Sequence, residues 1–189
     1  MSDIFTFTDA VMIACSAHYG QIDKGGHDYL KHPLHLAHKC NSKRLSNDTQ
    51  KVAVLHDVLE DSEYTFESLV ARGVPENIIT SLKLLTHIPD KAFIQKVVNI
   101  RVSNGWSESQ ATSYAKEQEY YRYVYAMIDN EMAAAVKLED LTHNSDITRV
   151  PPELFQNGGR LSNRLKKYAF ARKILISRHW DEREELDGD

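Results

Sequence analysis

The residues best suited to chemistry lie in one short segment, HDVLED, at positions 56–61. His56 and Glu60 are four residues apart, as are Asp57 and Asp61, so on a helix each pair would share a face. The apolar stretch VAVL just before them predicts a buried helix. A histidine and three acids at its end would be costly without compensation, which a divalent cation would provide. Imidazole together with carboxylate favours Mn²⁺, Fe²⁺ or Zn²⁺ over Ca²⁺.

Three further segments could complete such a site. His32, which is followed by proline, lies 24 residues before HDVLED, and Asp140 lies 83 residues after Asp57. Asn144 follows Asp140 by one helical turn, and Lys24 begins a Lys-Gly-Gly turn shortly before His32. A lone histidine is more often a packed or surface residue than a ligand, so the prediction rests on the joint order of these segments. The other seven histidines are assigned no functional role.

Helical patterns dominate the chain and must position these side chains. Apolar spacing and capping residues predict helices at 10–17, 33–41, 67–72, 107–129, 130–146 and 161–178, and two more that begin at 47–49 and at 75. No sustained strand alternation, internal repeat or interdomain linker is found. We therefore expect an all-α protein, with one helical bundle over residues 1–180 and an acidic tail over residues 181–189.

Composition limits the class of protein. A chain of 189 residues with 42% hydrophobic and 26% charged residues can bury a core as a single folded domain. No window approaches the roughly 18 apolar residues that span a bilayer, and the N-terminal residues do not form a signal peptide. The two cysteines form no CxxC pair, which fits a reducing compartment. These features predict a cytoplasmic protein without a membrane partner.

The net charge of −4 is unevenly distributed. The tail, DEREELDGD, carries six acids and one arginine, a net of −5, so the other 180 residues carry +1. No nucleic-acid partner is expected. The seven basic residues of 160–178 suit a solvated face, a phosphate funnel, or a surface for a second copy or for the tail. The tyrosine-rich stretch 114–125 suits core packing or a nucleobase-stacking wall.

Three blocks carry a resemblance to a known family. They are AHYGQIDKGGHDYLKHPLHLA, VAVLHDVLEDSEYTFESLVARGVPENIITSLKLLTH and VKLEDLTHNSDITRVP, which together span residues 17–151. In this order they resemble the HD superfamily of metal-dependent phosphohydrolases. Within it, the chain is most similar to the hydrolase domain of RelA/SpoT enzymes and their small stand-alone relatives. The resemblance implies a single HD-domain helical bundle.

The resemblance also implies the metal site. His32, His56, Asp57 and Asp140 would bind one ion, typically Mn²⁺, although another divalent metal would fit the same ligands. Such an ion polarises phosphoryl oxygen and lowers the pKa of bound water. Glu60 and Asp61 match an acidic pair that activates or orients the attacking water; we favour Glu60 as the base.

Three other residues match substrate-binding positions of the family. Lys24 can neutralise phosphate, Tyr29 can pack on sugar or base, and Asn144 would contact the nucleotide. Lys24 as an ordinary surface lysine is the alternative. The chain departs from the family pattern at four positions, with Asp23 where arginine is usual, Asp28 where proline is usual, and Glu139 and Leu141 in KLEDL where the family has KLADR. These departures affect base recognition more than hydrolysis.

The expected activity is removal of the 3′-pyrophosphate from guanosine 3′,5′-bis-diphosphate (ppGpp) alarmones of the stringent response. One alternative is a phosphohydrolase that acts on another nucleotide, such as an adenine alarmone, a nucleoside phosphate or the 2′-phosphate of NADPH. Another is a metal-binding signalling module without turnover, against which the acidic pair at 60–61 argues. The partner would be a small nucleotide, and self-association into a homo-oligomer is left open.

Overall fold

The computed structural model describes residues 5–23, 25–149 and 158–180. Over these ranges it contains α-helices, one 3₁₀ turn and an isolated bridge between Ile22 and Asp28, but no strand. The helices are α1 (Phe7–Ala17), α2 (Lys31–Ser42), α3 (Asn47–Leu55), α4 (Phe66–Ala71), α5 (Glu76–Leu85), α6 (Lys91–Ser103), α7 (Glu108–Tyr125), α8 (Glu131–Asn144) and α9 (Gly158–Ser177), with the 3₁₀ turn at Ile147–Arg149. The expectation of an all-α protein is confirmed.

Side-chain capping sets where the helices begin. Thr6 caps α1 and forms a reciprocal pair with Asp9, so the helix starts at Phe7, earlier than the predicted start at residue 10. Ser46 caps α3, one residue before the predicted range. Pro33 lies in the first turn of α2, where a backbone N–H has no acceptor within the helix, so proline costs no hydrogen bond there. The expected start at Pro75 and end before Gly73 are confirmed, since Pro75 is the N-cap of α5 and α4 ends at Ala71.

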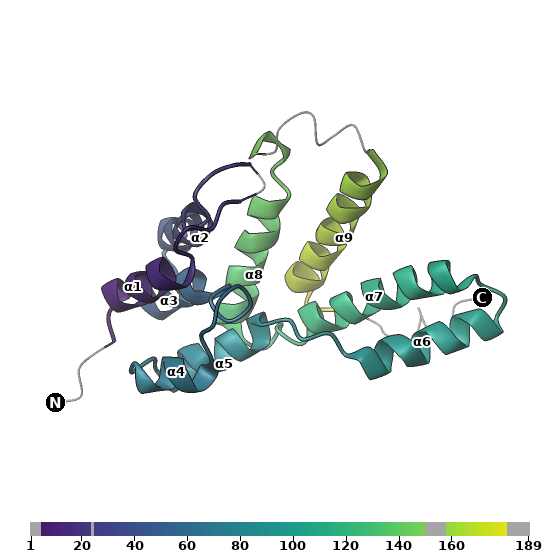
Figure 1. Ribbon diagram of the computed structural model, residues 1–189, viewed down its shortest axis with the longest axis horizontal. Coiled ribbons are helices and arrows are strands. Elements are labelled where there is room, and N and C mark those ends of the chain that lie inside the picture. Colours follow the sequence, from purple (N-terminus) through teal and green to yellow (C-terminus); the bar gives the residue numbers. More distant parts are fainter. Residues whose placement is uncertain (1–4, 24, 150–157, 181–189) are drawn as a thin grey trace.

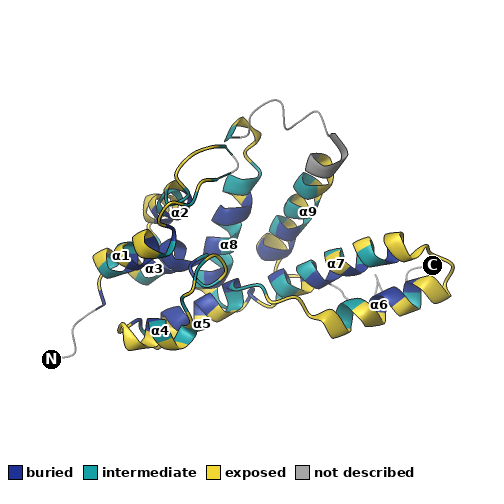
Figure 2. Ribbon diagram, viewed as in Figure 1, coloured by how far each residue is buried: buried dark blue, intermediate teal, exposed yellow. Residues whose placement is uncertain are grey.

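The centre of the molecule is α3. It packs against α1, α2, α5 and α8, and its stretch Val52–Leu55 is fully buried. Figure 2 shows this buried centre between the more exposed outer helices. Helix α9 lies against α7 and α8, and its Ala171 and Ile174 belong to the same hydrophobic core. The burial that fixes α3 therefore also fixes the residues at its C-terminal end.

Helices α6 and α7 form a hairpin that projects from this body (Figure 1). They pack mainly on each other around a small separate core of Val97, Val98, Ala111 and Ala115. Only the C-terminal half of α7 reaches the main core, where Tyr121 and Val124 are buried. The predicted tail at 181–189 lies outside the described residues, so the expected domain boundary stays a prediction. None of the described helices is long and apolar enough to cross a membrane.

Candidate metal centre and active site

Three elements bring the predicted metal ligands together. His32 lies in the first turn of α2, His56 caps the C-terminus of α3 with Asp57 directly after it, and Asp140 lies near the end of α8. The expectation that HDVLED continues a helix is wrong. Helix α3 ends at Leu55, and residues 57–63 form successive turns and bends. The turns nevertheless keep Asp57, Glu60 and Asp61 on one wall of a cavity, while the residues between them, Val58 and Leu59, pack against the core.

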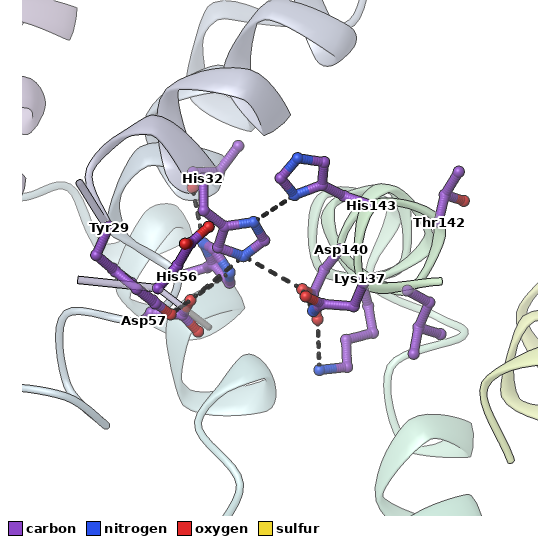
Figure 3. A network of polar contacts seen from close by, with 12 residues as sticks. Tyr29, His32, His56, Asp57, Lys137, Asp140, Thr142 and His143 are labelled. Carbon is purple, nitrogen blue, oxygen red and sulfur yellow. Dashed lines mark hydrogen bonds and ion pairs between the residues drawn. The ribbon is translucent and has the colours of Figure 1, made fainter. Parts of the chain in front are cut away.

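The ligand atoms of His32, His56 and Asp57 lie within 4.8 Å of one another, as a metal site requires. Asp140 faces this group across His32, with its Oδ1 3.4 Å from the Nε2 of His32. The Oδ2 of Asp57 lies 3.5 Å from the same Nε2 (Figure 3). Two imidazoles and two carboxylates, all four buried or half-buried, thus converge on one point.

The orientation of both imidazoles suits a metal ion. The Nδ1 of His56 donates to the carbonyl of Ala53 at 2.9 Å, which leaves Nε2 with its lone pair directed at the cluster. This Nε2 is buried and has no hydrogen-bond partner within the described part of the chain, although Asp57 Oδ2 lies 2.9 Å away. The Nδ1 of His32 contacts the Nδ1 of His143 at 2.7 Å, which likewise leaves Nε2 facing inward. A buried, orphaned nitrogen between carboxylates is what a bound cation would satisfy.

The charges in this cluster depend on one another. Burial alone would raise the pKa of Asp57, but the neighbouring histidines outweigh it and hold that pKa well below its usual range. Asp140 shows the same balance, with Lys137 as the main opposing charge, 2.9 Å away. Burial would lower the pKa of His32, but its hydrogen bonds and charge interactions with Asp140 and Asp57 raise it to about 9. Without metal, a proton on His32 therefore compensates the two carboxylates.

The acidic pair lies beside this cluster. Glu60 and Asp61 both line the pocket, and loss of hydration there raises the pKa of Glu60, although much of this residue is open to solvent. The hydroxyl of Tyr29 donates to Asp57 at 2.5 Å and to Asp61 at 3.2 Å. The amide of Gln21 donates to the main-chain carbonyl of Asp61 at 2.7 Å. Tyr29 thus joins Asp57, a predicted metal ligand, to Asp61 of the acidic pair.

The other predicted substrate positions differ in what the structure says of them. Lys24 lies outside the described residues. Asn144 lines the pocket and donates to Asp140 Oδ1 at 2.5 Å. Asp23 accepts hydrogen bonds from the main-chain N–H groups of Gly25 and His27, and its second oxygen pairs with Arg149 at 3.0 Å. Both carboxylate oxygens of Asp23 are therefore already engaged, one by the N–H groups of the loop and the other by Arg149.

The predicted site opens into a cavity of about 540 Å³. Besides the predicted site residues, its lining includes His87, Lys137 and Arg149, to which the sequence gave no role. It also includes side chains from the stretch 114–125 and from the segment 160–178, for which a stacking wall and a phosphate funnel were among the uses left open, namely Tyr120, Tyr123, Arg164 and Tyr168. In the tyrosine-rich stretch 114–125, some side chains pack in the core and others line the cavity. Tyr121 is buried against Phe170, whereas Tyr120 and Tyr123 face the cavity. The cavity therefore has an acidic side, which holds the predicted metal ligands, and an aromatic, basic side.

Comparison with known proteins places this geometry in context. The chain is 30% identical over 138 residues to the bifunctional (p)ppGpp synthase/hydrolase SpoT of Escherichia coli K12, an alignment that covers 71% of this chain and 17% of SpoT. It is 29% identical over 136 residues to the guanosine-3′,5′-bis(diphosphate) 3′-pyrophosphohydrolase of Haemophilus influenzae, covering 70% of this chain and 17% of that enzyme. The resemblance to RelA/SpoT-type proteins is confirmed at the level of sequence.

The chain thus matches about a sixth of the length of these curated relatives. No family model matches it. Among solved structures, a metazoan SpoT ortholog described as hydrolysing ppGpp aligns over 100% of this chain and 98% of its own, with a TM-score of 0.46 and 14% sequence identity.

Proposed function

We propose, on the premise of this similarity to SpoT-type enzymes, that the chain is a metal-dependent pyrophosphohydrolase that releases the 3′-pyrophosphate of guanosine 3′,5′-bis-diphosphates. Several relatives carry the name of this activity. The observation that supports hydrolysis most directly is the orphaned Nε2 of His56, which is directed at Asp57 in the tautomer that a metal ion requires. A water-activating acidic pair next to such a site has little use in a module that only binds.

In this mechanism His32, His56, Asp57 and Asp140 hold a divalent ion, for which Mn²⁺ is our choice. When bound, it polarises a phosphoryl oxygen and acidifies the attacking water. Glu60, whose pKa is raised by lost hydration, takes the proton of that water. Tyr29 keeps Asp57 and Asp61 in a fixed relation through its hydroxyl.

The far side of the cavity suits the rest of a nucleotide. Tyr120, Tyr123 and Tyr168 offer ring surfaces for a base or ribose, and Arg164 adds a cation for phosphate. Lys137 lies between the two sides, bound to Asp140 and 5.5 Å from the ring centre of Tyr123. A substrate with a phosphate group at the metal and a second one at Arg164 would use both sides, as a bis-diphosphate does.

One observation favours a second candidate, a phosphohydrolase of the same mechanism acting on another nucleotide. The family pattern that the sequence resembles has arginine at position 23, whereas this chain has Asp23, which is held by its own loop and by Arg149. A carboxylate cannot stack on a purine as a guanidinium can. An adenine alarmone or the 2′-phosphate of NADPH is therefore the alternative substrate class.

A single experiment tests these proposals. The purified chain is stripped of metal, reloaded with Mn²⁺, Mg²⁺ or Zn²⁺, and given a nucleotide panel with identification of the products. Pyrophosphate released from ppGpp supports the first proposal. Turnover of other nucleotides only, or monophosphate as the product, supports the second, and no turnover with any metal contradicts both. Cytoplasmic location and homo-oligomer formation stay predictions.

A further inference from the structure

We infer that His87 and Glu119 are positioning residues for Glu60, and that they act through the main-chain N–H of His87. This inference rests on the proposed hydrolase function, in which Glu60 takes the proton of the attacking water. Neither residue belongs to the motif blocks' catalytic positions, and His87 is among the histidines to which the sequence assigned no role. The contacts around the connector from α5 to α6, residues 86–90, carry the inference.

The first contact is made by the connector itself. The main-chain N–H of His87 donates to Oε1 of Glu60 at 2.6 Å. Because Glu60 lies in an irregular segment after α3, no helix fixes its direction. The bond engages Oε1 and so leaves Oε2 as the oxygen that can accept a proton from water. The position of one backbone N–H therefore sets the position of the proposed base.

The second contact fixes the connector from the hairpin. The Nε2 of His87 lies 3.1 and 3.0 Å from the two carboxylate oxygens of Glu119 on α7. Oε1 of Glu119 also accepts the main-chain N–H of Asp90, the residue that caps α6, at 3.1 Å. Glu119 thus holds both ends of a four-residue stretch that leads out to the hairpin in Figure 1.

Burial makes this clamp stiff. The side chain of Glu119 is only 7% exposed, so these hydrogen-bond donors must replace the water that its carboxylate has lost. The ring of His87 lies 4.3 Å from that of Tyr123, centre to centre, and meets Tyr120 edge-on at 5.9 Å. The hydroxyl of Tyr123 donates to the carbonyl of Leu85, just before the connector. Rings, acid and backbone together restrict where His87 can place its N–H.

This arrangement predicts a loss of rate rather than of binding. A displacement of about 1 Å in a reacting group can cost on the order of 100-fold in rate. Glu119→Ala and His87→Ala are each expected to lower kcat by roughly 10- to 100-fold, with KM and metal affinity changed by less than about 3-fold. The double variant should be no slower than the slower single variant, because both substitutions break the same contact.

Rescue and control variants separate positioning from folding. Glu119→Gln retains an acceptor for His87 and Asp90, so it should recover most of kcat. Glu108→Gln removes an exposed acid from the first turn of the same helix and should leave kcat unchanged. An increase in KM at constant kcat would overturn the inference, since His87 lines the pocket and would then be a substrate contact. Additive losses in the double variant would overturn it as well.

A readout that needs no substrate keeps this test apart from the proposed function. Hydrogen exchange of the His87 amide, followed by NMR on the metal-free protein, reports its bond to Glu60. Exchange should accelerate at least about 10-fold in Glu119→Ala and not in Glu108→Gln. If the wild-type chain has no hydrolase activity but the amide responds in this way, the proposed function fails while the clamp stands. An amide unaffected by Glu119→Ala would refute the clamp itself.

Discussion

The pH dependence of metal binding follows directly from the charge balance around His32. In the metal-free protein, burial lowers the pKa of His32, but Asp140 and Asp57 outweigh burial and raise the pKa to about 9. A metal ion needs the neutral imidazole, so binding must release this proton. At pH 7, two units below the pKa, only about 1% of the imidazole is neutral, a penalty of about 2.7 kcal/mol on the metal affinity. Asp57 and Asp140, with lowered pKa values, are already ionised and add no such penalty.

We therefore expect the association constant for Mn²⁺ to rise about tenfold per pH unit, or about 100-fold between pH 6 and pH 8. Isothermal titration calorimetry at pH 7, in two buffers with different ionisation enthalpies, should show that His32 contributes about one released proton per ion. His38→Ala, on the exposed side of the same helix, is the matched control and should leave the slope unchanged. A flat pH profile with no proton release would show that His32 is already neutral.

The same shift predicts the stability of the metal-free protein. A folded-state pKa above the unfolded value of 6.5 adds stability that is complete below pH 6.5 and is lost as the pH rises through 9. A shift from 6.5 to about 9 corresponds to about 3 kcal/mol. The thermal midpoint of the metal-free chain should therefore fall across this range, while the metal-loaded chain, whose His32 carries no proton, should lack this contribution. Scanning calorimetry with and without Mn²⁺ checks both curves.

The remaining predictions concern single side chains. His56→Ala and Asp57→Ala should each abolish metal binding, measured by calorimetry, and activity; full activity in either variant would overturn the ligand assignment. Glu60→Gln should keep the metal affinity but lower kcat by about 100-fold or more. In the wild-type chain the rate should fall at acid pH as Glu60 is protonated, with a midpoint above 4.5 because the pKa of Glu60 is raised, and the variant should lack this fall. His143→Ala, which removes the partner of His32 Nδ1, should weaken metal binding about 10- to 100-fold. Unchanged affinity would mean that His143 does not orient the ligand.

The sequence predicts which of these side chains come together, because their order is encoded in short local motifs; their role as metal ligands stays a prediction. His32, His56 and Asp57 converge as the motifs indicate, and the helices that carry them are recognisable from apolar spacing and capping residues. The local conformation of HDVLED was predicted wrongly. Its i, i+4 spacing suits a helix, and although hydrogen-bonded turns replace the helix after Leu55, Asp57, Glu60 and Asp61 still line one cavity. Tertiary contacts, including the bond from Gln21 to the Asp61 carbonyl, accompany this local departure.

For the aromatic and basic side of the cavity, the sequence named a stacking wall and a phosphate funnel but could not choose them over their alternatives. Tyr120, Arg164 and Tyr168 come from α7 and α9, and nothing in either helix alone says that they share a cavity with the predicted ligands at α2 and α3. Only the packing of α9 against α7 and α8 brings these residues to the site. Their periodicity indicates helical faces without saying which other helix each face meets.

Asp23 shows most clearly how contacts change the interpretation of a residue. In the sequence it is an acid at a position where arginine would read a base. In the structure its carboxylate accepts two N–H groups of its own loop and holds Arg149, whose guanidinium also lies 3.0 Å from Nδ1 of His143. Replacing Asp23 with arginine would remove those acceptors and put a second cation beside Arg149. Base preference is therefore better probed at Arg149, which lines the cavity and pairs with Asp23 but takes no part in the two N–H bonds within the loop.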